Sequence, residues 1–344
     1  MKSMVLTGLN RIEIADRPIP ELKNPEDVLI RMRSVGVCGS DIHYYSIGNI
    51  GSQVVQFPFT LGHEGAGIIE KTGNGVKTLK PGDRVAIDPA MPCFTCDQCK
   101  TGRYHTCRNL KFLGCPGQSE GCLSEFIVMP SLSCFPIPEN MTLDQAALSE
   151  PLAIGLYAVR SAGPLAGKSV AIIGTGPIGI SVMLSAIAGG VGKVYMTDKI
   201  DERLALASEM GAQWTGNAEK GDIVREILRE EPQQIDFVFE CCGQQEAADQ
   251  AVELLKPGGR LMIIGIPAFR RWSFDVDNLR RKEISIQNVR RQNGVVKETL
   301  EMISGGRLNP ERMQTHSFSL DDAGKAFELV AGYRDGVMKA MIHI

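Results

Sequence analysis

The chain has 344 residues, of which 43% are hydrophobic and 22% charged, with a formal net charge of −3. That length predicts two domains. The sequence has no dominant basic stripe, so we expect no nucleic-acid partner. The first residues lack an apolar run with a cleavage site, and no stretch has the apolar length that spans a bilayer. We therefore expect a cytoplasmic globular protein with no membrane partner.

The first 90 residues have the pattern of strands separated by turns. Short strands of this kind favour a small β-barrel with loops over a helical domain. We expect strands at 3–7, 28–32, 65–70 and 83–87, because short apolar runs there lie between glycine- or proline-containing turns.

Two clusters of possible metal ligands lie in or beside these loops. The first offers a thiol, a hydroxyl, a carboxylate and an imidazole within six residues, and the second offers an imidazole and a carboxylate. A catalytic zinc needs three protein ligands and one open position, which one loop rarely supplies alone. Cys38 alone could be a small buried hydrophobe, but the two clusters together favour a metal. They contain Cys38, Ser40, Asp41 and His43, then His63 and Glu64.

Four cysteines follow with the spacing C-x2-C-x2-C-x7-C. Four thiolates close the coordination sphere of one tetrahedral ion, so this lobe, about residues 90–110, predicts a structural zinc. An iron–sulfur cluster is the alternative, but the ferredoxin pattern has a short third gap followed by proline, whereas Arg108 follows here. The predicted ligands are Cys93, Cys96, Cys99 and Cys107, and we expect Cys115, Cys122, Cys134, Cys241 and Cys242 to be packing residues.

Glu150 precedes an apolar run at 152–158. A charge there is costly unless it is paired or bound to a metal. Glu150 is therefore a further candidate for the metal site.

From Lys168 the pattern changes to that of a parallel α/β sheet. A strand at 169–173 leads into a glycine-rich turn and an apolar helix, and a second strand at 193–197 ends in Asp198. In this setting G-x-G-x-x-G predicts a dinucleotide site, because the glycines admit a pyrophosphate at the helix N-terminus; a sheet without a nucleotide is the alternative. Asp198 favours NAD over NADP, although Lys199 and Arg203 bring cations nearby. The turn contains Gly174, Gly176, Pro177, Ile178 and Gly179.

Strands and helices continue to alternate to about residue 289, as in a βαβ series. We expect helices at 202–210 and 246–255, strands at 235–240, 260–266 and 283–289, then helices at 297–303 and 321–330 and a last strand at 338–342.

Taken together, these motifs resemble those of the zinc-containing medium-chain alcohol dehydrogenases over essentially the whole chain, and most closely the sorbitol (polyol) dehydrogenase branch. The resemblance implies an α/β fold. A GroES-like β-barrel catalytic domain would comprise 1–153 and 288–344, and a Rossmann domain with a doubly wound parallel sheet would bind NAD at 154–287. It also implies an active site in the cleft between the domains, two zinc ions per chain, and a homo-oligomer, either a tetramer or a dimer.

The same resemblance implies roles for individual residues. Substrate oxidation would yield a ketone from a secondary alcohol, with hydride transfer to NAD. Cys38 and His63 would bind the catalytic zinc with Glu64 or Glu150 as the third ligand, Asp41 would accept a hydrogen bond from His63, and Ser40 and His43 would relay the proton.

The sequence departs from the polyol branch where Arg290-Arg291 stands in place of an Arg-Tyr pair, while Tyr44 keeps the aromatic residue after His43. A second guanidinium could bind a substrate carboxylate bidentately, which favours a sugar acid such as an aldonate over a neutral polyol. Arg291 could equally face the cofactor or a surface acid. L-Threonine 3-dehydrogenase is the alternative enzyme. A non-catalytic nucleotide-binding relative is the alternative of another class, and the presence of every ligand and relay residue argues against it.

Overall fold

The computed structural model describes residues 1–344, which form two compact units. The first unit comprises Met1–Glu150 and Val296–Ile344, and the second comprises Pro151–Val295. The domain boundaries expected at 153/154 and 287/288 stay a prediction, because a compact unit is not by itself a functional domain. None of the helices combines the length and the apolar character needed to cross a bilayer.

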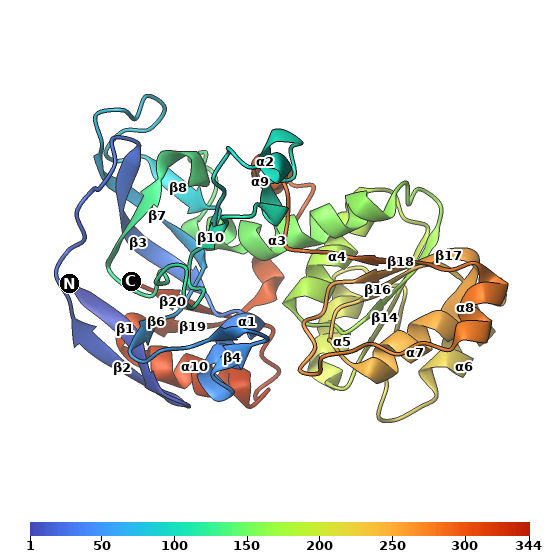
Figure 1. The fold of residues 1–344 in the computed structure, drawn as a ribbon. Helices are drawn as coiled ribbons and strands as arrows, with labels where there is room; N and C mark the ends of the chain where they lie inside the picture. The colour runs from blue at the N-terminus through green and yellow to red at the C-terminus, as the bar shows by residue number, and fades with distance from the viewer. The chain divides into compact units, whose positions relative to one another are not determined.

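The first unit is built on a largely antiparallel sheet in which β3 is the central strand (Figure 1). The order is β12-β8-β7-β3-β20-β19, and β11 also pairs with β3. The last strand of the chain, β20, thus lies beside a strand from its beginning. The bounds are β3 Asp27–Gly36, β7 Glu64–Thr72, β8 Arg84–Ile87, β11 Phe126–Pro130, β12 Cys134–Pro136, β19 Gln314–Ser319 and β20 Lys339–His343.

Smaller strands and several helices complete this unit. Helix α10 packs on its core through Phe327, whose ring lies 5.4 Å from that of Tyr45. The strands are β1 Lys2–Gly8, β2 Arg11–Asp16, β4 Asn49–Ile50, β5 Gln53–Val54, β6 Phe59–Thr60, β9 Ala90–Met91 and β10 Lys111–Phe112. The helices are α1 Gly39–Ser46, α2 Asp97–Lys100, α9 Val296–Ser304 and α10 Ala323–Ala331, with 3-10 turns at Tyr104–Thr106, Ser131–Ser133, Glu311–Met313 and Leu320–Asp322.

Helix α3, Leu143–Ala162, was not predicted from the sequence, and Pro151 lies inside it. Its start carries a capping box: the Thr142 hydroxyl accepts from the Gln145 N–H at 3.1 Å, and the Gln145 side chain accepts from the Thr142 N–H at 2.8 Å. This Thr-x-x-Gln pattern satisfies two free N–H groups of the first turn. The cap and the buried apolar face keep the helix despite the proline.

The second unit contains a six-stranded parallel sheet with helices along both faces, so the predicted doubly wound architecture is confirmed (Figure 1). The strand order is β15-β14-β13-β16-β17-β18. From β13 the chain first adds strands on one side of the sheet and then, from β16, on the other side. In such folds ligands bind at this switch point, outside the carboxyl ends of the strands. The strands are β13 Ser169–Ile173, β14 Lys193–Asp198, β15 Trp214–Asn217, β16 Ile235–Glu240, β17 Leu255–Ile263 and β18 Ser285–Asn288. The helices are α4 Pro177–Ala188, α5 Asp201–Glu209, α6 Ile223–Glu230, α7 Gln245–Leu254 and α8 Val276–Lys282.

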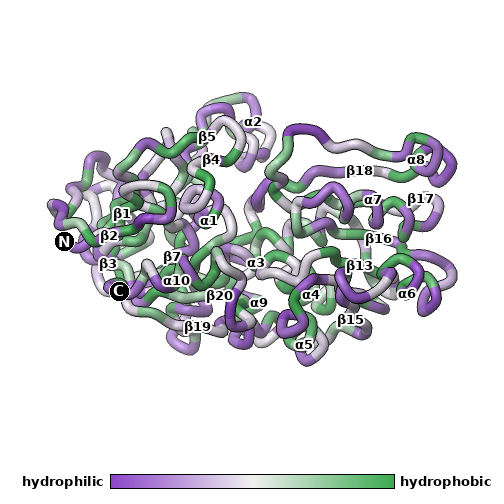
Figure 2. Tube along the Cα trace, turned by 90° about the horizontal axis from the view of Figure 1, so that it is seen from below, coloured by the Kyte–Doolittle hydropathy of each residue, from purple (hydrophilic) through white to green (hydrophobic).

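Hydrophobic residues concentrate along the inner strands of this sheet, such as β16, whereas α8 at its edge has no buried residue (Figure 2). Helix α6 and strand β15 were not anticipated. Asp222 caps α6 by accepting a hydrogen bond from the Arg225 N–H at 3.0 Å. Both elements are short, and their apolar patterns are too brief to stand out from a loop.

Candidate active site

Strand pairing brings the two predicted ligand clusters of the first unit together. Cys38 follows β3 and is the N-cap residue of α1, while Glu64 begins β7 and pairs with Gly36 of β3. The ligand atoms of Cys38, His63 and Glu64 all lie within 4.8 Å of one another. A thiol, an imidazole and a carboxylate at this spacing match the donor set of a catalytic zinc site.

Asp41 connects the two clusters. Its carboxylate accepts the backbone N–H of Cys38 and that of Gly62, both at 3.2 Å, and lies 3.4 Å from Nδ1 of His63. Burial lowers the pKa of His63, but Asp41 and Cys38 together raise it well above its ordinary value. With Nδ1–H directed at a carboxylate, Nε2 is the ring atom available to a metal, as the predicted role of Asp41 requires.

The two candidate carboxylates have different partners. Both oxygens of Glu64 accept hydrogen bonds from the Lys339 ammonium group, at 2.7 and 2.8 Å. Glu150 is buried on α3, and its Oε2 atom has no hydrogen-bond partner. Burial, opposed by the nearby His63, raises the pKa of Glu150 to about 7. A carboxylate enclosed without a partner fits a position that a cation occupies.

The relay residues lie on α1, one helical turn apart. The Ser40 hydroxyl donates toward the Cys38 sulfur at 3.4 Å. Burial lowers the pKa of His43, so its ring is neutral near pH 7 and able to accept a proton. Tyr44, by contrast, is buried in the core, where its hydroxyl donates to Gln53 at 3.1 Å.

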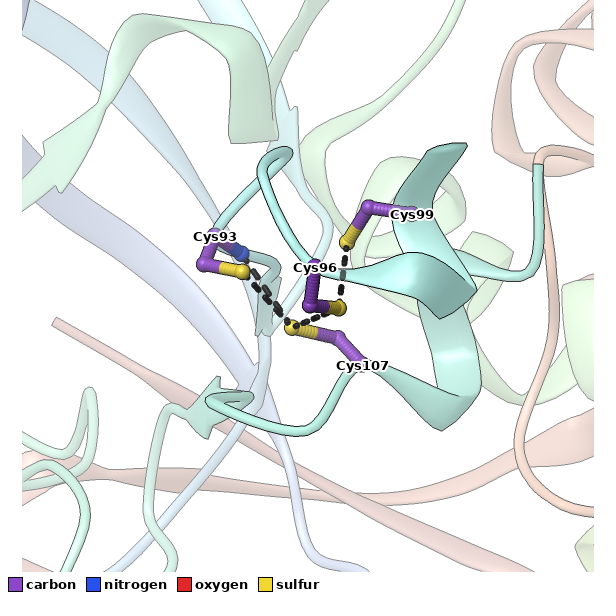
Figure 3. A group of neighbouring side chains, drawn as sticks. All are labelled: Cys93, Cys96, Cys99 and Cys107. Atoms are coloured by element: carbon purple, nitrogen blue, oxygen red, sulfur yellow. Dashed lines mark hydrogen bonds between the residues drawn. The ribbon is translucent and has the colours of Figure 1, made fainter. Parts of the chain in front are cut away.

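The four cysteines of the predicted structural site point toward one another (Figure 3). The sulfur of Cys107 lies 3.5 Å from that of Cys93 and 3.9 Å from that of Cys96, and Cys96 lies 3.5 Å from Cys99. Zn–S bonds of about 2.3 Å in a tetrahedron separate the sulfurs by about 3.8 Å. The spacing therefore fits one ion and leaves no room for a cluster of several irons.

The glycine-rich turn of the second unit joins β13 to α4. Gly176 is the N-cap of α4 and Pro177 opens the helix. A Cβ on Gly179 would lie 2.0 Å from the Gly174 carbonyl oxygen, so the two segments meet at a distance that only glycine allows. The turn thus exposes a helix N-terminus of the kind that binds a pyrophosphate.

Asp198, at the end of β14, is fixed beside this turn. Its carboxylate accepts backbone N–H groups of Thr175 at 2.7 Å, Lys199 at 2.8 Å and Ile200 at 3.0 Å. Arg203 is buried on α5, with its guanidinium 3.7 Å from where a Cβ of Gly176 would stand. An acid and a cation therefore both lie at the predicted ribose position.

Arg290 and Arg291 follow β18 in the second unit, whereas the metal ligands belong to the first. Arg291 has φ of 54°, in the left-handed region. The substrate contacts predicted for Arg290, Arg291 and Tyr44 stay predictions.

Comparisons with known proteins agree with this geometry. The family model described as "Alcohol dehydrogenase GroES-like domain" matches residues 24–139, and the one described as "Zinc-binding dehydrogenase" matches residues 177–305. The sorbitol dehydrogenase of Bacillus subtilis is 33% identical over 344 residues, covering 100% of this chain and 97% of that protein. The chain belongs to the zinc-containing medium-chain alcohol dehydrogenase family.

Solved structures of dehydrogenases show the same fold. An Escherichia coli oxidoreductase/dehydrogenase of unknown specificity superposes with a TM-score of 0.94 at 30% identity, covering 100% of this chain and 99% of the other. L-Idonate 5-dehydrogenase of Escherichia coli gives 0.92 at 26% identity, covering 100% and 98%. The expected GroES-like and Rossmann architecture of this dehydrogenase is thereby confirmed, and the matched family is that of zinc-binding dehydrogenases.

Lys339, which contacts Glu64 of the candidate metal site, was not predicted from the sequence. Lys339 is 1% exposed and lies in the apolar run of β20, between Met338 and Ala340. A lone charge inside an apolar strand was the available signal, because such a charge needs a buried partner.

Proposed function

We propose that this dehydrogenase oxidises a secondary alcohol of a polyol or sugar acid to the ketone, with NAD as acceptor and a catalytic zinc held by Cys38, His63 and a glutamate. The observation that carries the proposal is the close grouping of Cys38, His63 and Glu64, with Glu150, whose Oε2 atom has no hydrogen-bond partner, nearby. The likeness to sorbitol dehydrogenase supports a polyol, and the likeness to L-idonate 5-dehydrogenase supports a sugar acid.

Each group has a chemical role in the reaction. Cys38, His63 and a glutamate would hold a zinc ion that would polarise the substrate hydroxyl, and NAD held at the glycine-rich turn would accept the hydride. Ser40, beside Cys38, accepts the hydroxyl proton, and the neutral ring of His43 takes it on toward solvent. Asp41 holds His63 in the orientation that directs Nε2 at the metal position.

A substrate panel tests the proposal. Sorbitol, xylitol, L-idonate and L-threonine would each be offered with NAD, and NADH formation followed by absorbance. Turnover of a polyol or of the aldonate supports the proposal, whereas turnover of L-threonine alone would identify the alternative enzyme. No turnover of any secondary alcohol by the zinc-loaded chain would favour the non-catalytic relative.

Replacing His43 with glutamine is expected to lower kcat by about ten- to a hundredfold near neutral pH, because the relay loses its proton acceptor. The loss should shrink at alkaline pH, where hydroxide in solvent can take the proton from Ser40. The control is His316→Gln, at a half-buried histidine of β19 that pairs with Asp335. A kcat unaffected by His43→Gln across this pH range would remove His43 from the relay.

Replacing Asp198 with alanine is expected to shift the preference toward NADP by about tenfold or more in kcat/KM. The carboxylate is held by three backbone N–H groups, so its charge cannot move away from a 2′-phosphate. Glu202→Ala, at an exposed acid on α5, is the control. An unchanged NAD to NADP ratio in the Asp198 variant would contradict the role given to this residue.

Replacing Arg291 with tyrosine is expected to weaken kcat/KM for an aldonate by about ten- to a hundredfold, and for a neutral polyol by much less. The reason is the loss of one charge-assisted, bidentate contact with the substrate carboxylate. Parallel assays with sorbitol and L-idonate measure the difference. Equal losses on both substrates would rule out carboxylate binding by Arg291.

The cytoplasmic location and the homo-oligomer, a tetramer or a dimer, also remain parts of the proposal. The location is an expectation from the sequence, and the homo-oligomer is implied by the family resemblance. Cell fractionation tests the first, and light scattering of the purified chain tests the second.

A further inference from the structure

A buried carboxylate without a cationic partner lies at the carboxyl edge of the parallel sheet in the second unit. Glu240 ends β16 and is 0% exposed. Its Oε1 atom accepts the backbone N–H of Cys242 at 2.8 Å and that of Gly243 at 2.5 Å. Its Oε2 atom is enclosed and has no hydrogen-bond partner. Neither oxygen meets a lysine or arginine side chain, so the chain itself leaves this charge without a counter-charge.

Close backbone packing gathers three segments of this edge around Glu240. A Cβ on Gly174, in the glycine-rich turn after β13, would lie 2.9 Å from the Cβ of Cys242. A Cβ on Gly265, which follows β17, would lie 2.6 Å from Glu240 Oε2, and the Gly265 N–H donates to the Glu240 carbonyl at 3.0 Å. The turn after β16, which Glu240 holds from within, is therefore packed against the predicted dinucleotide turn.

The two thiols of this turn add no charge of their own. Burial, followed by the charge of Glu240, raises the pKa of Cys241 well above its ordinary value, and the same two causes raise the pKa of Cys242. Both thiols are therefore protonated near pH 7. The carboxylate of Glu240, whose negative charge two N–H donors stabilise, is the charged group of this turn.

The order of the strands indicates which part of a dinucleotide meets this turn. Asp198 of β14 lies at the predicted adenosine ribose position, and the N-terminus of α4, after β13, is the predicted pyrophosphate position. The next strand in the sheet is β16. A dinucleotide that crosses the switch point in this direction extends its nicotinamide half toward the carboxyl end of β16, where Glu240 lies.

The nicotinamide ring is the cation that the proposed reaction brings to this edge. It carries a positive charge in NAD⁺ and none once it has accepted a hydride. An enclosed carboxylate without a counter-charge attracts such a cation, because the protein interior screens charges less than water does.

We propose that the buried carboxylate of Glu240 favours the oxidised cofactor, because it attracts the positive ring of NAD⁺ and has no such attraction for NADH. This inference rests on the proposed use of NAD. Because Glu240 is enclosed, it acts through its charge and not by contact with the cofactor. Hydride transfer removes the charge of the ring and with it the attraction, so the reduced cofactor is held less tightly and leaves more easily.

Binding of the two cofactors in the absence of substrate tests this inference. Isothermal titration calorimetry would give the Kd of NAD⁺ and that of NADH for the wild type and for Glu240→Gln, which keeps the size of the side chain and an oxygen acceptor for the two N–H groups. We expect the ratio of the NAD⁺ Kd to the NADH Kd to rise by about tenfold in this variant. Glu240→Asp, which keeps the charge, should stay close to the wild-type ratio. The control is Glu231→Gln, at a half-buried acid that pairs with Lys193 at the opposite, amino edge of the sheet, and it should leave the ratio unchanged.

The outcomes separate this inference from the proposed function. Equal weakening of NAD⁺ and NADH binding by Glu240→Gln would show that Glu240 only shapes the turn, and would overturn the inference. If Glu240→Gln does not fold, Glu240→Met, which is also uncharged and of similar volume, should give the same shift in the ratio, and an unchanged ratio in that variant would overturn the inference as well. A wild-type chain that binds neither NAD⁺ nor NADH would instead contradict the proposed use of NAD, and the inference with it.

Discussion

Cys38→Ala is expected to lower turnover by about a thousandfold or more while leaving the melting temperature close to that of the wild type. The thiol is one of three candidate ligands whose donor atoms lie within 4.8 Å of one another, and the ion that they would hold would provide several kcal/mol of charge stabilisation in the reaction. Cys38 caps a short helix and is partly exposed, so its loss removes little core packing. Steady-state kinetics and thermal denaturation of the same preparation measure both effects.

The matched control is Cys134→Ala, at a buried free cysteine on β12 of the same unit. That variant should lose some stability and keep its turnover. Retention of most activity by Cys38→Ala would show that this thiol does not bind the catalytic ion.

Cys96→Ala is expected to have the opposite profile, with a large loss of stability. The lobe that carries the four cysteines has little regular structure beyond α2 and one 3-10 turn, so the ion supplies much of its folding energy. We expect the free energy of unfolding to fall by several kcal/mol, which corresponds to a drop in Tm of about 10 °C for a unit of this size.

Lys100→Ala, at an exposed residue of α2, serves as the control because it leaves all four thiols in place. Its melting temperature should match that of the wild type. An unchanged Tm in Cys96→Ala would contradict the structural role of the zinc.

The sequence predicted those parts of the site whose residues lie close together along the chain. The four cysteines fall within one short lobe, and the glycine turn lies between a strand and a helix, so spacing alone indicated each ligand set. Cys38 and His63 come together only because β3 pairs with β7. The turn-rich pattern indicated strands here but did not determine which strands pair.

The partner of Lys339 could not be predicted from the sequence, because 275 residues separate this lysine from Glu64 and the pairing of β20 with β3 brings them together. Helix α3 was not predicted either. It contains Pro151, which disfavours a helix interior, and a cap at Thr142 together with burial stabilises it nevertheless.

The decisive measurement is the zinc content of the purified chain, because each chain is expected to bind one catalytic and one structural zinc. Atomic emission would be used for the wild type, Cys38→Ala and Cys96→Ala. We expect two zinc ions per chain in the wild type and one in each variant, with the ion lost from a different site in each case. A wild-type chain with a single zinc, or a Cys38→Ala chain that still holds two, would contradict this expectation.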